Sequence, residues 1–193
     1  TSAGVLTFVS APDYETKSSY TATITAWDGK NPTTQSIAVS VNDLNESPTF
    51  TSSAAFSALE NQTLIGSVLV SDPENGLITY SLSGANASSL AISSSGVLRF
   101  SSTPDYETKT SYTATVTATD GANSIDQSVT VTVTDVDDEA PVFTSGSTFS
   151  AAENQTAIDN VTVTDVDTDN SSISFSISGS ELSITSVGVL TFV

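Results

Sequence analysis

Acidic side chains are concentrated in the segment Thr134–Phe143, which reads TDVDDEAPVF. Asp135, Asp137, Asp138 and Glu139 fall within five residues, and no Lys or Arg lies nearby to pair with them. Carboxylates this close repel one another at neutral pH unless a divalent cation lies among them. The segment directly follows SVTVTVT, an alternation typical of a β-strand. We therefore predict a calcium-binding linker between two β-domains.

The composition favours cations as partners. The 193 residues include 22 Asp and Glu against 4 Lys and Arg, and the formal net charge is −18. This charge argues against nucleic acid and anionic membrane surfaces as partners. Cys and His are absent, so soft-metal sites and disulfides are excluded. Calcium suits such a chain because it takes about six to eight oxygen ligands.

The chain is apolar enough to bury a core, since 37% of its residues are hydrophobic. A small extracellular β-protein without disulfides needs another stabilising element, and a metal ion is the usual one. No run of about 18 apolar residues occurs, so the sequence predicts no membrane span. It begins in the middle of a repeated pattern, and we expect it to belong to a longer protein.

The sequence repeats itself with a period of 92 residues. The recurring motifs are GVLTF (4–8, 96–100 as GVLRF, 188–192), PDYETK (12–17, 104–109) and SYTAT (19–23, 111–115). The spacing is 93 for PTF and PVF (48–50, 141–143), because Ala140 is inserted, and also for ENQT (60–63, 153–156). The positions of these motifs within the period predict the C-terminal part of one repeat at 1–46, a complete repeat at 47–139 and the N-terminal part of a third at 140–193.

Strict alternation of apolar residues with Thr or Ser indicates β-strands throughout. The predicted strands are 20–26, 37–41, 55–59, 65–71, 77–83, 89–92, 97–101, 112–118 and 129–133. About seven short strands per repeat are typical of an antiparallel β-sandwich. The residues expected in the core of the middle repeat are Phe50, Phe56, Tyr80, Leu82, Leu90, Ile92, Leu98, Phe100, Tyr106 and Tyr112.

The acids occupy five recurring places in the repeat, namely Glu-Asn, Asp-x-Asp or Asp-x-Glu, Asp-Tyr-Glu, Asp-Gly and the linker. Only Asp126, Asp159, Asp169 and Glu181 fall outside these places. Solvated surface charge would be spread more evenly.

The order ENxT, DxD, GVL, DYE, YxAxVxAxDG and VxVxDx[ND][DE]xPxF resembles the extracellular cadherin repeat over essentially the whole sequence. The resemblance implies an all-β fold of tandem seven-stranded Greek-key β-sandwiches, immunoglobulin-like in architecture and joined end to end. It also implies about three calcium ions at each junction between repeats.

The resemblance assigns oxygen ligands to two junctions. At the second junction the ligands from the middle repeat are Glu60, Asp105, Glu107, Asp135, Asp137, Asp138 and the Glu139 carbonyl, and those across it are Asp165 and Asp167. At the first junction they are Asp13, Glu15, Asp43, Asn45, Glu46 and the Ser47 carbonyl, with Asp72, Glu74 and Asp120 across it. A backbone carbonyl near Asn75 or Asn170 is expected to complete the outermost ion.

The two junctions depart from the family pattern in opposite directions. The first has Asp-Leu-Asn-Glu-Ser where Asp-x-Asn-Asp-Asn is usual, and Glu74 where Asp is usual. The second has Asp137 where Asn is usual, which adds charge. We expect the first junction to bind calcium more weakly.

These observations predict an extracellular, secreted or surface-displayed stalk or fibre that calcium stiffens and that serves adhesion or surface structure. Composition favours a microbial adhesin. The expected partners are neighbouring repeats of the same chain, like molecules in a filament, or a cell-surface ligand. The alternative is that the repeats themselves bind carbohydrate or each other. Paired carboxylates also occur in glycosidases, but their recurrence in each repeat favours a protein that is not an enzyme.

One further question concerns the two ends of the sequence. Residues 140–193 and 1–46 together would make one complete domain. A continuous covalent chain is the simpler interpretation, and completion between subunits is the other.

Overall fold

The computed structural model describes residues 3–168 and 172–193, whose regular structure consists mainly of β-strands. The strands are β1 (Ser19–Trp27), β2 (Pro32–Ser40), β3 (Thr49–Phe50), β4 (Ala55–Leu59), β5 (Leu64–Ser67), β6 (Val70–Ser71), β7 (Thr79–Ser83), β8 (Leu90–Ile92), β9 (Val97–Phe100), β10 (Ser111–Thr119), β11 (Ser124–Thr134), β12 (Val142–Phe143), β13 (Ala157–Asn160), β14 (Val163–Thr164), β15 (Leu182–Ile184) and β16 (Val189–Phe192). The helix η1 is Ala87–Ser89. Among these residues no helix has the length and apolar character needed to cross a membrane.

The chain divides into two compact units. The first comprises the N-terminal residues as far as Phe56 together with Ile65–Arg99 and Thr113–Thr130. The second comprises Ser57–Leu64, Phe100–Tyr112 and Val131–Val193. Each unit contains one of the two acidic linkers and the loops expected to supply acids to it. The repeat boundaries at 46/47 and 139/140 stay a prediction.

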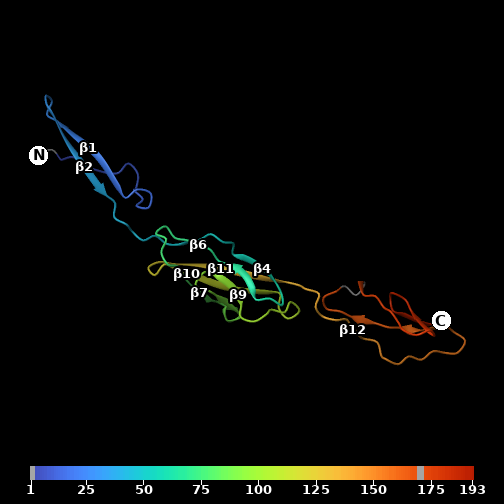
Figure 1. Ribbon diagram of the computed structural model, residues 1–193. Coiled ribbons are helices and arrows are strands. Elements are labelled where there is room, and N and C mark those ends of the chain that lie inside the picture. The colour runs from blue at the N-terminus through green and yellow to red at the C-terminus, as the bar shows by residue number, and fades with distance from the viewer. Residues whose placement is uncertain (1–2, 169–171) are drawn as a thin grey trace. The chain divides into compact units, whose positions relative to one another are not determined.

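The middle repeat is built from two main sheets (Figure 1). One has four strands in the order β4-β11-β10-β7, and the other has three in the order β5-β9-β8. Together they supply the seven strands predicted, and the all-β sandwich fold is confirmed. The predicted strand 65–71 is divided, because β6 leaves the β5 sheet to pair with β3. Between β5 and β6 the backbone N–H of Val68 donates to the Gly96 carbonyl at 2.8 Å.

The core follows the alternation along the two longest strands of this repeat. Val116 of β10 and Val129 and Val131 of β11 are fully buried, whereas Thr130 and Thr132 between the β11 valines are exposed. Burying each such side chain contributes roughly 1.5–3 kcal/mol to folding.

The predicted core list is correct only in part. Leu90, Leu98 and Phe100 are buried. The remaining predicted members keep part of their surface exposed, and these are Phe50, Phe56, Tyr80, Leu82, Ile92, Tyr106 and Tyr112. Ala and Val fill the inner faces of β10 and β11, because small and β-branched side chains let two sheets of a small sandwich approach closely.

The first part of the chain is an antiparallel hairpin of β1 and β2, with a register that runs from Ser19↔Ser40 to Trp27↔Pro32. It corresponds to β10 and β11, 92 residues later. The rings of Phe8 and Tyr20 meet edge to face at 5.1 Å, and the equivalent rings of Phe100 and Tyr112 meet in the same way at 5.1 Å. The periodic sequence therefore gives a periodic structure.

The last part of the chain repeats the other strands of the sandwich. Its sheets β12-β14 and β13-β16-β15 correspond to β3-β6 and β5-β9-β8. Gly96 and Gly188 occupy the same turn, with φ of 79° and 86°. A Cβ at Gly96 would lie 2.3 Å from the Val68 carbonyl oxygen, and one at Gly188 would lie 2.3 Å from that of Val161. Only glycine fits either turn.

Candidate metal centres

Glu60 is the most deeply buried acid of the second unit, with 3% of its surface exposed. It follows β4, and its own backbone N–H donates to the Thr134 carbonyl at the end of β11. Its two carboxylate oxygens accept hydrogen bonds from the backbone N–H groups of Tyr106 and Val136, each at 2.8 Å. Both oxygens of this buried carboxylate therefore have backbone donors as partners.

Glu60 lies within a group of converging carboxylates. One oxygen each from Glu60, Glu107 and Asp135 lie within 4.8 Å of one another. A second group at the same distance consists of Glu107, Asp138 and Asp167, so Glu107 belongs to both. Desolvation, together with repulsion from Asp167 and Glu60, raises the pKa of Asp135. These carboxylates therefore repel one another and attract a cation.

Asp167 binds the backbone of the linker. One of its oxygens accepts the N–H groups of Asp138 at 3.0 Å and Glu139 at 2.6 Å. The bond from Glu139, followed by that from Asp138, lowers the pKa of Asp167. Its other oxygen is buried and has no hydrogen-bond partner among the residues that the structure describes. A buried carboxylate oxygen of this kind is available to a metal ion.

Two polar side chains hold this second linker in place. Thr168 donates from its hydroxyl to Asp137 at 3.1 Å, and its backbone N–H donates to Asp165 at 2.8 Å. The amide of Asn61 donates to the carboxylate of Asp138. Asn61 has φ of 59°, which is a conformation that Asn adopts more readily than most residues.

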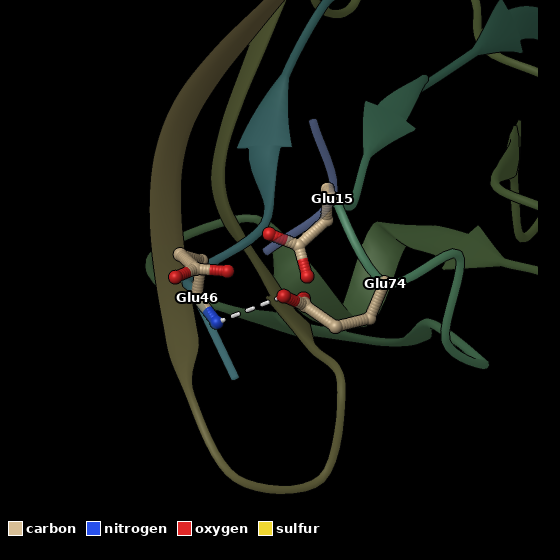
Figure 2. Close-up of side chains that lie close together, drawn as sticks. All are labelled: Glu15, Glu46 and Glu74. Atoms are coloured by element: carbon tan, nitrogen blue, oxygen red, sulfur yellow. Dashed lines mark hydrogen bonds between the residues drawn. The ribbon is translucent and has the colours of Figure 1, made fainter. Parts of the chain in front are cut away.

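The first unit contains a third group of carboxylates, from Glu15, Glu46 and Glu74, again with one oxygen each within 4.8 Å (Figure 2). The backbone N–H of Glu46 donates to Glu74 at 3.3 Å. A side-chain hydrogen bond with Glu74, aided by desolvation and by repulsion from Glu15, raises the pKa of Glu46 to about 7. The carboxylates of this group therefore repel one another at neutral pH.

Buried unpaired oxygens occur here as well. Asp72 is 8% exposed, and one of its oxygens accepts the Gly76 N–H at 2.6 Å. Its other oxygen and one oxygen of Glu74 are buried and have no hydrogen-bond partner within residues 3–168 and 172–193. Such atoms are costly unless something binds them.

Amide side chains hold the first linker. Asn45 donates to the Asp120 carboxylate at 2.8 Å. Asn123 donates to the Asn45 and Glu46 carbonyls at 3.1 and 3.2 Å. Neither Asn123 nor Asn61 was predicted from the sequence to hold a linker. Asn recurs three residues after the aspartate of the Asp-Gly motif, in DGKN and DGAN, and it recurs directly after Glu in ENQT. This recurrence is the signal in the sequence that could have identified both residues.

The Asp-Tyr-Glu loops share one local structure. Thr16 caps Asp13 through its N–H and its hydroxyl, each at 3.0 Å. Thr108 caps Asp105 in the same way at 2.8 and 2.9 Å. The turn fixes the residue after Tyr, and so it positions Glu15 and Glu107 for the carboxylate groups.

The structure thus brings together eight of the predicted ligands in its three carboxylate groups, namely Glu15, Glu46, Glu74, Glu60, Glu107, Asp135, Asp138 and Asp167. The other predicted ligands lie outside these groups, namely Asp13, Asp43, Asn45, Ser47, Asp72, Asp105, Asp120, Asp137, Glu139 and Asp165. Asn170 lies outside the described residues. That any of these residues bind metal stays a prediction.

The donor set fits calcium. All the converging atoms are oxygens, and two of the four basic side chains, Lys17 and Lys109, lie instead over the rings of Tyr20 and Tyr112 at 4.5 and 4.3 Å. A hard divalent cation binds carboxylate and carbonyl oxygens in flexible geometry. The geometry can therefore hold such ions between the linker and the loops on each side of it.

Comparison with known proteins agrees with this geometry. No protein-family model matches the chain. It is 39% identical to human protocadherin-23 over 160 residues, which are 72% of this chain and 5% of that protein. It is 31% identical to mouse protocadherin Fat 4 over 199 residues, which are 93% of this chain and 4% of that protein. The solved cis-dimer of protocadherin gammaB7 EC3-6 matches with a TM-score of 0.71 and 25% identity, over 95% of this chain and 52% of that chain.

The chain spans only about one twentieth of these curated relatives, so the similarity concerns their repeats and not their whole length. The similarity extends over 72% to 95% of the present sequence. The relatives are animal proteins, and so the comparisons give no support to the microbial origin expected from composition.

Proposed function

We propose that this chain, a stretch of extracellular cadherin repeats, is part of a stalk or fibre whose junctions are stiffened by calcium. The role is mechanical, since it spaces and orients whatever adhesive surface the protein presents. A non-enzymatic adhesion role agrees with the cadherin and protocadherin relatives. Both their adhesion and their calcium binding come to this chain as part of the proposal.

One observation carries the proposal. At each linker, carboxylates that are distant in sequence converge within 4.8 Å. In the described part of the chain, buried oxygens of Asp72, Glu74 and Asp167 have no hydrogen-bond partner. Stable packing of such groups requires a counter-charge. Calcium would supply it by binding the carboxylates from both sides of each linker. Without calcium, repulsion favours separation of those loops.

The number of ions is part of the same proposal. About three ions at each junction would bring roughly +6 of charge to a cluster of comparable negative charge. Among the described residues, the second junction has two carboxylate groups that share Glu107, and the first junction has one group. This difference supports a fuller set of ions at the second junction.

A second candidate function is binding between like chains through the repeats. It is favoured by the cis-dimer of the protocadherin gammaB7 relative. Carbohydrate binding has no comparable support, although Trp27 is 62% exposed and offers a ring to a sugar.

The test of the calcium role is small-angle scattering and limited proteolysis of the chain, with calcium and with a chelator. We expect calcium to give a longer, stiffer and more protease-resistant particle. Unchanged length, stiffness and resistance after chelation would contradict the proposal. Self-association, measured by sedimentation in the same buffers, tests the second candidate.

A further inference from the structure

The loop between β6 and β7 of the middle repeat contains the segment Asp72-Pro-Glu-Asn-Gly76. Asn75 is the only asparagine of the chain that glycine follows. Asparagine is a thermolabile residue, and glycine makes it more so, since it has no Cβ to hinder the approach of its backbone nitrogen to the asparagine side chain. Asn75 and Gly76 are both exposed and belong to no strand. This loop therefore combines the residues for spontaneous deamidation with access to water.

The reaction needs water and no other reactant. The backbone nitrogen of Gly76 attacks Cγ of Asn75, a C–N bond forms, and the side-chain amide nitrogen leaves as ammonia together with the proton of the attacking nitrogen. Water then opens the cyclic succinimide at either of its two carbonyls. One product is aspartate, and the other is isoaspartate, in which the main chain runs through the former side chain. Both products carry a carboxylate where the neutral amide stood.

The fold holds the attacking nitrogen of this reaction. The Gly76 N–H donates to a carboxylate oxygen of Asp72 at 2.6 Å, and the Asn75 N–H donates to the Asp72 carbonyl at 3.1 Å. Asp72 is buried, so both bonds fix the loop to the body of the repeat. The attacking nitrogen must lose its proton, and a carboxylate that accepts that N–H stabilises the protonated form. The bond to Asp72 therefore opposes deamidation.

The same turn explains why glycine follows this asparagine. Asn75 has φ of 57°, and its side-chain amide donates to the Pro73 carbonyl at 3.3 Å. A Cβ at residue 76 would lie 2.9 Å from the Asp72 oxygen that accepts the Gly76 N–H. A larger residue would push the buried carboxylate aside. The close contact that protects the site thus also requires the residue that makes it labile.

We propose that Asn75 is the site at which this chain deamidates spontaneously, and that the buried carboxylate of Asp72 sets the rate by holding the Gly76 N–H. While that hydrogen bond is intact, the nitrogen cannot attack and deamidation is slow. When the loop opens, the nitrogen is released and the reaction proceeds as in the unfolded chain. The extent of modification therefore records how often this loop opens.

Deamidation would change the charge and the geometry of the first junction. Asn75 directly follows Glu74, which belongs to the carboxylate group with Glu15 and Glu46 (Figure 2). Either product adds a negative charge next to Glu74. Isoaspartate also lengthens the main chain, so Gly76 no longer meets Asp72 in the same turn. If the proposed function is correct, on which this consequence alone rests, an isoaspartate-containing chain binds calcium more weakly at the first junction.

The test follows the full chain during incubation at mildly alkaline pH in chelator, so that it does not depend on the calcium role. Mass spectrometry of peptides identifies each asparagine that has become an acid, and isoaspartate-specific enzymatic methylation measures the isoaspartate. The same chain unfolded in urea gives the unprotected rate. We expect Asn75 to be modified first in both states, and the folded chain to react more slowly than the unfolded chain. Asp72→Ala should raise the folded rate by about tenfold, as expected when a hydrogen bond to a charged group is lost.

Glu74→Gln is the matched control, because it removes a carboxylate from the same loop and leaves the Gly76 N–H and its Asp72 acceptor in place. Its deamidation rate should equal that of the unmodified chain. Asp72→Asn keeps an acceptor oxygen without the charge, and it should give an intermediate rate even if circular dichroism shows that Asp72→Ala is unfolded. Asn75→Gln should yield no product at this position.

Three results would overturn the proposal. The first is modification of another asparagine before Asn75 in the folded chain. The second is an equal rate at Asn75 in the folded chain and in urea. The third is a Glu74→Gln chain that deamidates as fast as the Asp72 variants, which would show that general loosening of the loop, and not the bond from Gly76 to Asp72, sets the rate.

Discussion

The carboxylate of Glu60 accepts a hydrogen bond from the backbone N–H of Val136 at 2.8 Å, across 76 residues of sequence. Its second oxygen accepts the N–H of Tyr106 at 2.8 Å. One buried side chain thus holds the Asp-Tyr-Glu loop and the linker in fixed relation, and these segments carry Glu107 and Asp135. Glu60 therefore positions the segments that carry the other carboxylates of the cluster, and it is itself a member of that cluster.

Replacing Glu60 by Gln tests both roles, because it changes the hydrogen bonds that the side chain accepts and removes its charge from the cluster. The amide keeps one acceptor but places an NH₂ group against the second backbone donor, so a buried N–H loses its partner. We expect Glu60→Gln to lower the free energy of unfolding by about 1–3 kcal/mol even in chelator. We also expect a loss of calcium affinity at the second junction, measured by calorimetric titration.

Glu181→Gln is the control for Glu60→Gln, because Glu181 is exposed and belongs to none of the carboxylate groups. It removes the same charge without touching the cluster. Equal effects of the two substitutions on stability and on calcium binding would show that Glu60 acts only through net charge.

Glu46→Gln should act in opposite directions with and without calcium. The hydrogen bond with Glu74 and the nearby carboxylates raise the pKa of Glu46 to about 7, which shows that its charged form is disfavoured in the metal-free cluster. Removing that charge relieves repulsion, and so thermal unfolding in chelator should occur at the same or a higher temperature. Calcium affinity at the first junction should fall by about tenfold, because charge count sets affinity at such sites. A fall in unfolding temperature in chelator would contradict this account.

The two linkers should release calcium in order. In the part of the chain that the structure describes, the first junction has one carboxylate group and the second has two. The first should therefore open at a higher free calcium concentration. A Glu-specific protease can cleave after Glu46 in the first linker and after Glu139 in the second. As calcium is lowered, mass spectrometry should detect cleavage after Glu46 before cleavage after Glu139. The reverse order would show that the first linker is the stronger one.

The fold could be predicted because several independent signals in the sequence agree. Alternation of Val with Thr places Val129 and Val131 on the inner face of β11, and the structure buries both fully. The 92-residue period then transfers the assignment of β10 and β11 to β1 and β2. Aromatic residues were harder to place, since size alone predicted burial of Tyr80 and Tyr112 and the structure leaves both partly exposed.

The site could be predicted as a set of acids but not as a geometry. Glu15, Glu46 and Glu74 come from three separate loops, so their spacing in the sequence does not indicate that they are neighbours. Only the family resemblance predicted that these residues lie together. The residues that hold the loops were missed, as with Asn123, which donates to two linker carbonyls. An amide that binds backbone carries no charge and no apolar pattern, so only its recurrence in DGKN and DGAN could have marked it.

Gly96 provides a test of the repeat's architecture that is independent of metal. It has φ of 79°, and a Cβ there would lie 2.3 Å from the Val68 carbonyl oxygen, where the backbone cannot move aside without breaking the hydrogen bond from Val68 N–H to Gly96. Gly121 has φ of 99° but no atom within 4 Å of its Cβ position. Gly121→Ala should therefore cost only the conformational strain, about 1–2 kcal/mol. Gly96→Ala should cost a further 1–3 kcal/mol or so from overpacking. Urea unfolding in chelator measures both, and equal losses of stability would mean that the turn at Gly96 is not packed against Val68 as the structure has it.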